Sequence, residues 1–252
     1  MGARGTVLMM RGDLDGARTE CEMARCLAEA GGDRYTETWA LLDLGLSASY
    51  AGDDTAAARY GDALDALATV VGAPSIRGWA AYLHGERLAE RDPTAATRHL
   101  TDAFAAAEEV DDRFLAGVAR HTLMTTAARM DEAGHAVTSF AGLLGQWNGS
   151  GAWTQLWLTM RALIEALSRH GRHREAAVLL GAHATSRRAP AVFGADARRL
   201  DAAAAIARRN LGDEFDAAWS EGVALDDQRA ITLAIDLTNA AHVPTPQLSG
   251  RR

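Results

Sequence analysis

The residues of this chain best suited to chemistry are pairs of aspartates. Asp53 and Asp54 follow Gly52 and precede an alanine-rich run, and further pairs stand at 111–112 and 226–227. Such carboxylates would form a metal-dependent active site if their acids faced a shared cavity. They would equally serve a turn, in which glycine ends one helix and aspartate caps the next. The elements that position them decide between these interpretations.

Histidines and cysteines stand at spacings that disfavour a metal site. His170 and His173 flank a predicted turn, His183 lies nearly three helical turns further on, and no fourth donor is spaced to complete a zinc tetrahedron. On one helix, Cys21 and Cys26 point about 140° apart, which disfavours a disulfide or a shared metal. We therefore predict no metal, no cofactor and two reduced cysteines that pack in the core.

A turn followed by an alanine recurs about every forty residues, and such internal periodicity is the signature of a repeat architecture. The six alanines, at steps of 39 to 41 residues, are Ala17, Ala57, Ala96, Ala136, Ala176 and Ala217. Small side chains are expected there because two helices approach closely only where a small residue sits at their crossing. Large anchors recur with nearly the same step before the turns, at Trp39, Trp79, Val118 and Trp157.

Both segments of each unit have helical periodicity. Residues 152–167 place apolar side chains at steps of three and four, and proline is nearly absent from such segments. With 48% apolar residues, the chain has ample material to bury. Asp53 shares its position in the unit with Asp13, Asp92 and Asp213, and a catalytic site does not repeat at every turn of an array. We therefore interpret these aspartates as helix caps.

The repeat resembles a known family of helical repeats. Residues 41–64, LLDLGLSASYAGDDTAAARYGDAL, are similar to a tetratricopeptide repeat, with Leu44 and Gly45 in the first helix, the turn at 52–53 and Ala57 in the second helix. The resemblance implies an all-α fold. We expect a tetratricopeptide-like α-solenoid of about six helix-turn-helix repeats over residues 1–240, its first helix incomplete, followed by a disordered or extended tail at 241–252.

The segment 187–235 carries a more specific resemblance. It is similar to the closing segment of the large ATP-dependent transcriptional regulators of actinobacteria, of the LuxR type and the antibiotic-regulator type. The residues that match are Gly212, Phe215, Ala218, Trp219, Glu221, Gly222, Ala224, Leu225, Ala230 and Ile231. In that family an ATPase precedes the helical array.

This sequence departs from the family pattern in two ways. It has no GxxxxGK[ST] phosphate loop, and no helix-turn-helix follows residue 240, so we expect neither the ATPase nor DNA binding on this chain. About ten residues precede the first turn, at Gly12, which is too few for a full first helix. We expect the chain to be a fragment of a longer regulator or to have a misplaced start codon.

The first helices line the concave surface in arrays of this kind, where the resemblance implies that an inducer or a partner binds. The polar and aromatic candidates for that surface are Trp39, Trp79, His121, Thr125, Arg129, Arg161, Glu165 and Arg169. Apolar Leu42, Leu46 and Val118 map to the same face. A structural alternative stays open, in which the tryptophans belong to the core and Arg161 pairs with Glu165 along its helix.

Composition and charge limit the partners. A formal charge of −7 argues against nucleic acid and anionic membranes, and the N-terminal apolar run is too short for a signal peptide. We predict a cytoplasmic, non-enzymatic sensor or protein-interaction module of a transcriptional regulator. Its partner would be an ATPase domain or a second copy, with a small molecule or peptide as inducer. The alternatives are a stand-alone scaffold or homo-oligomer and, third, an all-α enzyme using paired aspartates.

Overall fold

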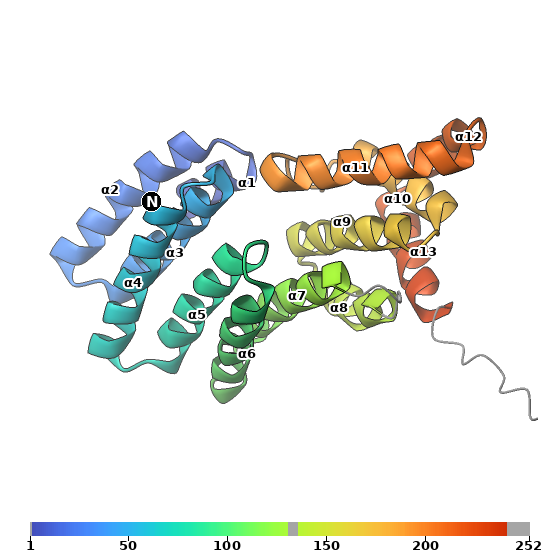
Figure 1. Cartoon of the computed structure of the whole chain (residues 1–252). Coiled ribbons are helices and arrows are strands. Elements are labelled where there is room, and N and C mark those ends of the chain that lie inside the picture. Colours follow the sequence, from blue (N-terminus) through green and yellow to red (C-terminus); the bar gives the residue numbers. More distant parts are fainter. Residues whose placement is uncertain (1, 131–135, 241–252) are drawn as a thin grey trace, which may run out of the picture. The chain divides into compact units, whose positions relative to one another are not determined.

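The computed structural model describes residues 2–130 and 136–240, and within them thirteen helices pack in sequential antiparallel pairs (Figure 1). This confirms the all-α prediction and is consistent with a helical repeat array. The turn expected at 131–135 and the tail expected at 241–252 lie outside the described residues. No described helix combines the length and the hydropathy that crossing a bilayer requires.

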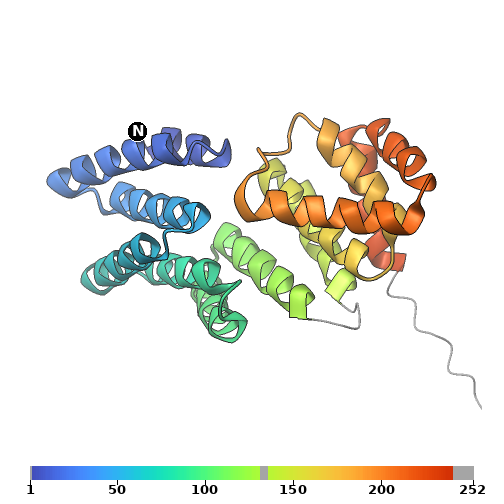
Figure 2. The ribbon, with the colours of Figure 1, turned by 45° about the horizontal axis from the view of Figure 1, so that its top comes forward.

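The chain divides into two compact units, of which the first runs to Met130 and also includes the separate segment Pro190–Asp201. Its helices lie alongside one another in chain order, blue to green in Figures 1 and 2. They are α1 (Gly2–Met10), α2 (Leu14–Gly31), α3 (Arg34–Ala51), α4 (Asp54–Val71), α5 (Pro74–Leu88), α6 (Pro93–Glu109) and α7 (Arg113–Met130).

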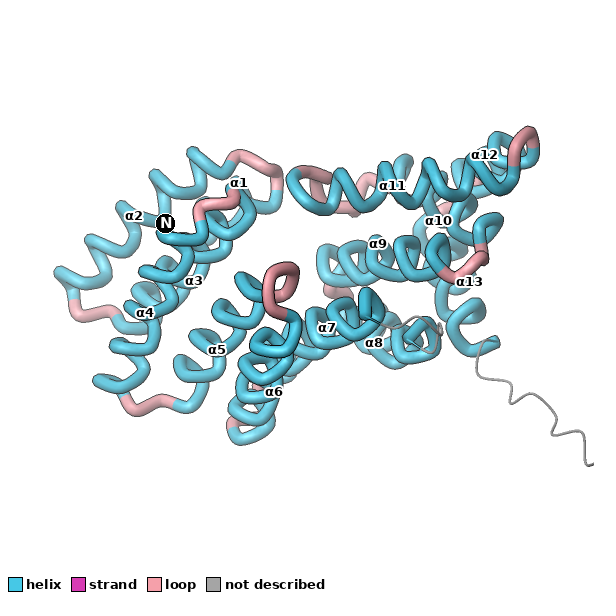
Figure 3. The backbone as a smooth tube through the Cα atoms, viewed as in Figure 1, coloured by secondary structure: helices cyan, strands magenta, loops and turns pink. Residues whose placement is uncertain are grey.

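The second unit comprises the remaining helices. They are α8 (Ala136–Ser150), α9 (Trp153–Arg169), α10 (His173–Thr185), α12 (Glu214–Val223) and α13 (Asp227–Ala240). Helix α11 (Gly194–Leu211) contributes residues 194–201 to the first unit and the rest to the second. The connections between successive helices of each unit are mostly short, as the pink segments of Figure 3 show.

Glycine and aspartate end and begin the early helices as predicted. Gly52 has a left-handed backbone with φ of 80°, and Asp53 Oδ1 accepts a hydrogen bond from the amide of Ala56 at 2.9 Å. The same pairing joins α1 to α2 at 12–13 and α2 to α3 at 32–33. Between α6 and α7, Asp111 takes the glycine position with φ of 53° and Asp112 caps the next helix.

The prediction that Asp213 caps the last repeat's second helix is wrong. Asp213 makes no side-chain hydrogen bond to the start of α12, and its backbone is helical, with φ of −65° and ψ of −18°. A capping residue needs an extended backbone to turn its side chain back toward the free amides. The pattern of a glycine followed by a capping aspartate therefore does not extend to this junction.

The repeated alanines are fully buried in four of the repeats. In the last repeat the buried alanine is one residue later than predicted. Ala17, Ala57, Ala96 and Ala176 have no exposed surface. The side chain of Ala136 lies outside the described set. Ala217 is exposed, and its neighbour Ala218 is buried instead. The prediction of Ala217 is thus wrong by one position: α12 begins directly after Asp213, as α4 begins directly after Asp53, but the backbone of Asp213 is already helical.

Two glycines bring α10 and α12 into very close contact. A Cβ atom at Gly181 would collide with the carbonyl oxygen of Trp219, and one at Gly222 would collide with the carbonyl oxygen of Val178. Val178 and Phe215 belong to the buried core of this unit, with Trp219 packed against it. The residues that carry the regulator resemblance in this segment therefore build a helix crossing.

Candidate functional site

The paired aspartates have structural contacts. Asp53 caps α4, and Asp54 forms ion pairs with Arg87 at 3.0 Å and Arg91 at 2.6 Å. Asp226 caps α13 through the amide of Arg229. These contacts agree with the capping interpretation, and they give Asp54 one arginine partner on α5 and one in the turn after it.

An aromatic row crosses the first helices of three successive pairs. Trp39 of α3 lies with its ring centroid 4.9 Å from that of Trp79 of α5. Tyr35 extends the row at one end, and Phe114 of α7 extends it at the other, 6.1 Å from Trp79. Trp79 is buried and Trp39 is half-buried. Trp79 therefore serves the core, while the two outer rings are exposed.

A polar cluster lies next to this row in the first unit. Tyr82 donates a hydrogen bond to Glu86 Oε1 at 3.0 Å, and Thr122 of α7 donates to the same oxygen. Two protons thus converge on one carboxylate oxygen between α5 and α7. We define the polar cluster as Tyr50, Tyr82, Glu86, His121, Thr122, Arg129, Asp196 and Arg199.

A distant stretch of the chain supplies two members of the polar cluster. Phe193 packs edge-on against Tyr50 at the end of α3, with 6.2 Å between ring centroids. A Cβ atom at Gly12 would lie 3.0 Å from the Phe193 ring, so glycine there makes room for this phenyl group. Arg199 forms ion pairs with Glu90 and with Asp196. The segment Pro190–Asp201 is therefore held by aromatic packing and by charge.

Desolvation dominates the electrostatics of the polar cluster. It raises the pKa of Glu86, against the opposing effect of the Thr122 and Tyr82 hydrogen bonds. It raises the pKa of Tyr82 well above its usual range, and the charge of Glu86 adds to that. It lowers the pKa of His121 to about 4, so this imidazole is neutral at pH 7.

Solvent still reaches several members of the polar cluster. Tyr50 keeps 37% of its surface exposed, and Glu86 and His121 are intermediate. The pKa of Tyr50 is nevertheless raised by desolvation, with the charge of Glu86 next. The side chains are thus surrounded by protein while remaining reachable, which is the condition for recognising a polar ligand through few directed groups.

The structure brings five of the eight predicted site residues into the first unit. Trp39 and Trp79 belong to the aromatic row, and His121 and Arg129 to the polar cluster. Thr125 is buried, and its hydroxyl donates to the carbonyl of Thr122 within α7 at 3.0 Å. Leu42 and Leu46, mapped to the same surface, are buried instead, because α3 packs against α1, α2, α4 and α5.

The other three predicted residues belong to the second unit. Arg161 is buried, and its Nε donates to His183 Nε2 at 3.0 Å beside Trp157. Burial and the Arg161 charge lower the pKa of His183 to about 4. Glu165 is half-buried and Arg169 is exposed. The predicted set is therefore divided between the two units.

Sequence reasoning missed Tyr50, Tyr82, Glu86, Thr122, Asp196 and Arg199. Glu86 had one available signal, since it is an acid four residues after Tyr82 within a largely apolar helix. Asp196 and Arg199 had none, because a contact across more than one hundred residues leaves no local pattern.

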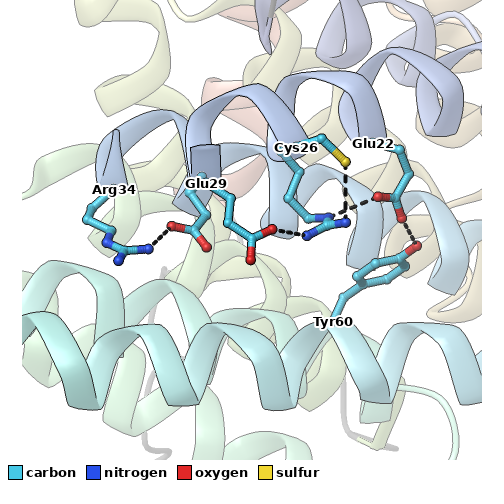
Figure 4. A network of polar contacts seen from close by, with 7 residues as sticks. Glu22, Cys26, Glu29, Arg34 and Tyr60 are labelled. Atoms are coloured by element: carbon cyan, nitrogen blue, oxygen red, sulfur yellow. Dashed lines mark hydrogen bonds and ion pairs between the residues drawn. The ribbon is translucent and has the colours of Figure 1, made fainter. Parts of the chain in front are cut away.

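A separate polar network joins α2 to α4. Glu22 accepts hydrogen bonds from the Tyr60 hydroxyl at 2.7 Å and from Arg25 at 2.9 Å (Figure 4). Arg25 also contacts Glu29 and the sulfur of Cys26. These hydrogen bonds hold the pKa of Glu22 below its usual range against the opposing effect of burial. The network ties successive second helices together.

Both cysteines are free, as predicted, but only one packs in the core. Cys21 is buried and Cys26 is exposed. Burial raises the pKa of the Cys21 thiol to about 12, with the nearby Asp43 charge as the next cause. The packing prediction is therefore wrong for Cys26, which faces away from the buried stripe of α2.

Comparison of the chain with known protein families, with curated proteins and with solved structures found no match. The resemblance to transcriptional regulators thus rests on the residues quoted for it in the sequence.

Proposed function

We propose that the chain is a non-enzymatic sensor or protein-interaction module of a transcriptional regulator, built as a tetratricopeptide-like solenoid with a period of about forty residues. The polar cluster and the aromatic row of the first unit form its binding surface. The sequence resemblance supports the regulator assignment, and the convergence of polar and aromatic side chains in the first unit supports the location that we propose for the surface.

One observation carries the location. The first unit already holds a polypeptide segment, Pro190–Asp201, which follows sixty residues after Met130. Phe193 of this segment packs on Tyr50 at the end of α3, and Arg199 pairs with Glu90 in the turn after α5. A surface that holds one segment by an aromatic anchor and an arginine has the chemistry to hold a similar segment of a partner.

The composition of the polar cluster favours a polar ligand with hydrogen-bonding groups. Glu86 and Asp196 offer carboxylates, Arg129 and Arg199 offer guanidinium groups, and His121 offers a neutral imidazole. By resemblance, the module would dock on an ATPase domain and release it when inducer binds. Such a switch requires that inducer bind one of the two states more tightly.

The test is thermal unfolding of the full chain, followed by tryptophan fluorescence, against fractionated metabolites and peptides of its host. A ligand at one hundred times its Kd stabilises by about 2.7 kcal/mol, a shift of a few degrees for a chain of this size. We expect a saturable shift that Glu86→Gln and Arg129→Ala each reduce. Arg169→Ala, an exposed change in the second unit, should leave the shift intact.

The other outcomes are equally decisive. A shift lost only in the Arg169→Ala variant would place the site in the second unit. No shift from any fraction would contradict a sensor and favour a docking scaffold.

A second candidate function, a scaffold or homo-oligomer, is favoured by exposed apolar side chains where second helices end and first helices begin. Tyr35 is 73% exposed and Val70 76% exposed, and Leu27, Val110 and Phe114 are also exposed. Apolar exposure of this kind marks protein contacts. Sedimentation equilibrium over a hundredfold concentration range would show self-association, and Tyr35→Ser should weaken it.

A further inference from the structure

Three side chains from two helices of the first unit converge between α4 and α5. Asp62 and Asp65 lie three residues apart on α4, and His84 comes from α5. One potential ligand atom from each lies within 4.8 Å of the others. Among the described residues, this is the group of potential metal ligands whose donor atoms lie this close together. The histidines considered in the sequence analysis, His170, His173 and His183, do not belong to it.

A second imidazole stands beside the first. The rings of His84 and His99, from α6, have centroids 5.3 Å apart with their planes inclined at 34°. With a zinc–nitrogen bond of about 2.05 Å and tetrahedral angles, two imidazoles on one ion have centroids about 5 Å apart. The centroid separation of the two rings is therefore close to that of two imidazoles on one ion, and His99 would supply a fourth ligand beside the three that already converge.

The backbone of α4 makes room for His84. A Cβ atom at Gly61 would lie 2.6 Å from His84 Cε1 and 3.1 Å from either ring nitrogen. Glycine inside a helix costs stability relative to alanine. Here it lets the imidazole lie against the helix, where Nε2 is 2.9 Å from Asp65 Oδ2. The His84 ring can occupy this position because Gly61 has no side chain.

From this convergence we propose that Asp62, Asp65, His84 and His99 form a binding site for a divalent transition-metal ion of the zinc class. Two carboxylate oxygens and two imidazole nitrogens are a donor set that suits zinc, and four ligands complete a tetrahedron. The ion replaces the hydrogen bond between His84 and Asp65, and the tetrahedron opens their donor atoms to about 3.4 Å. The bound ion would link α4, α5 and α6.

His84 lies beside His99, and histidine binds zinc as the neutral imidazole. The other charges that act on His99 are those of Arg98, Asp102 and Asp65. Both aspartates are exposed, so the ion would enter from solvent on the side of α4.

The test is isothermal titration of the full chain, stripped with chelator, with ZnCl2 at pH 7.5. We expect one ion per chain, a higher unfolding midpoint with zinc, and a four-coordinate visible spectrum with Co²⁺. His84→Ala should weaken zinc binding at least tenfold. Gly61→Ala should do the same although it keeps all four ligands, because it displaces the His84 ring.

Gly142→Ala is the matched control, since nothing lies within 4 Å of a Cβ atom there, and it should bind zinc as the unchanged chain does. Asp65→Asn, which keeps the size of the side chain, replaces Gly61→Ala if circular dichroism shows that the latter unfolds. The absence of stoichiometric binding overturns the proposal. Undiminished affinity in both His84→Ala and Gly61→Ala also overturns it, because zinc would then bind at other histidines.

Discussion

The indole ring of Trp39 lies 4.9 Å from that of Trp79, centroid to centroid, with the two planes inclined at 55°. The contact joins α3 to α5, the first helices of successive pairs. One indole is half-buried and the other is buried, so the pair connects the core of the first unit to its surface.

This geometry predicts unequal and coupled effects of substitution. Trp79→Ala should lower the free energy of unfolding by about 3–5 kcal/mol, as for other buried aromatic residues, and Trp39→Ala by less. A double-mutant cycle measured by urea denaturation should give a coupling energy of about 0.5–1.5 kcal/mol. Strictly additive losses would show that the two rings do not interact.

Substitutions of Asp53 can distinguish the contribution of its negative charge to stability from that of its capping hydrogen bond. Asp53→Ala removes the acceptor for the amide of Ala56 and should cost about 1 kcal/mol of unfolding free energy. Asp53→Asn should cost only a few tenths, because asparagine caps as well as aspartate does. Urea denaturation of both variants measures this difference. An equal and large loss in both would mean that the negative charge itself is required.

Local chemistry made this part of the fold predictable. A glycine with positive φ and a capping aspartate act on adjacent residues, so the turn at 52–53 is readable from the sequence. Burial of Ala57 follows from the same pattern. The burial of Ala218 in place of Ala217 could not be predicted from the sequence, because it accompanies a turn whose aspartate has a helical backbone.

The candidate site was only partly predictable, for a different reason. His121 and Arg129 lie at helical spacing on α7, and both belong to the polar cluster that the structure forms. Phe193 and Arg199 reach that surface from beyond the first seven helices, and their contacts are tertiary. The repeat pattern assigned Arg161 to the binding surface, but its side chain is buried against His183.

A buried carboxyl group should give the chain a distinctive pH dependence. Asp43 of α3 is buried and accepts a hydrogen bond from the Thr6 hydroxyl. Burial raises its pKa from 3.8 to about 6, and that hydrogen bond opposes the shift. Between these values the folded state binds more protons than the unfolded state, so stability falls as pH rises from about 4 to 6 and then levels off.

Asp43→Asn should remove that slope, which amounts to about 1–3 kcal/mol over the window. The comparison is the free energy of unfolding at pH 4.5 and at pH 7.0, so any constant cost of the amide cancels. Asp102→Asn, an exposed change on α6, should keep the slope of the unchanged chain. The expectation fails if the Asp43→Asn variant keeps it too.

At the crossing of α10 and α12, replacing glycine by any larger residue should destabilise the fold. Gly181→Ala places a methyl group against the backbone of Trp219, which cannot move aside as a side chain can, and should cost at least about 1–3 kcal/mol. Gly142→Ala on α8 meets no neighbour and should stabilise by about 0.5–1 kcal/mol, because alanine favours helices. Thermal unfolding of the two variants should therefore shift in opposite directions, and a shared direction would refute the close packing.

The first unit has a consequence for synthesis on the ribosome, because it is not contiguous in the chain. Its first 130 residues emerge early, but Pro190–Asp201 follows only after Asp131–Ala189 of the second unit has been made. At about 5–20 residues per second, the 71 residues from 130 to 201 take roughly 4–14 s. During that interval Tyr50 and Gly12 lack Phe193, and Glu90 lacks Arg199. The nascent array passes through a stage in which its polar cluster is open to chaperones or to a partner that arrives before synthesis ends.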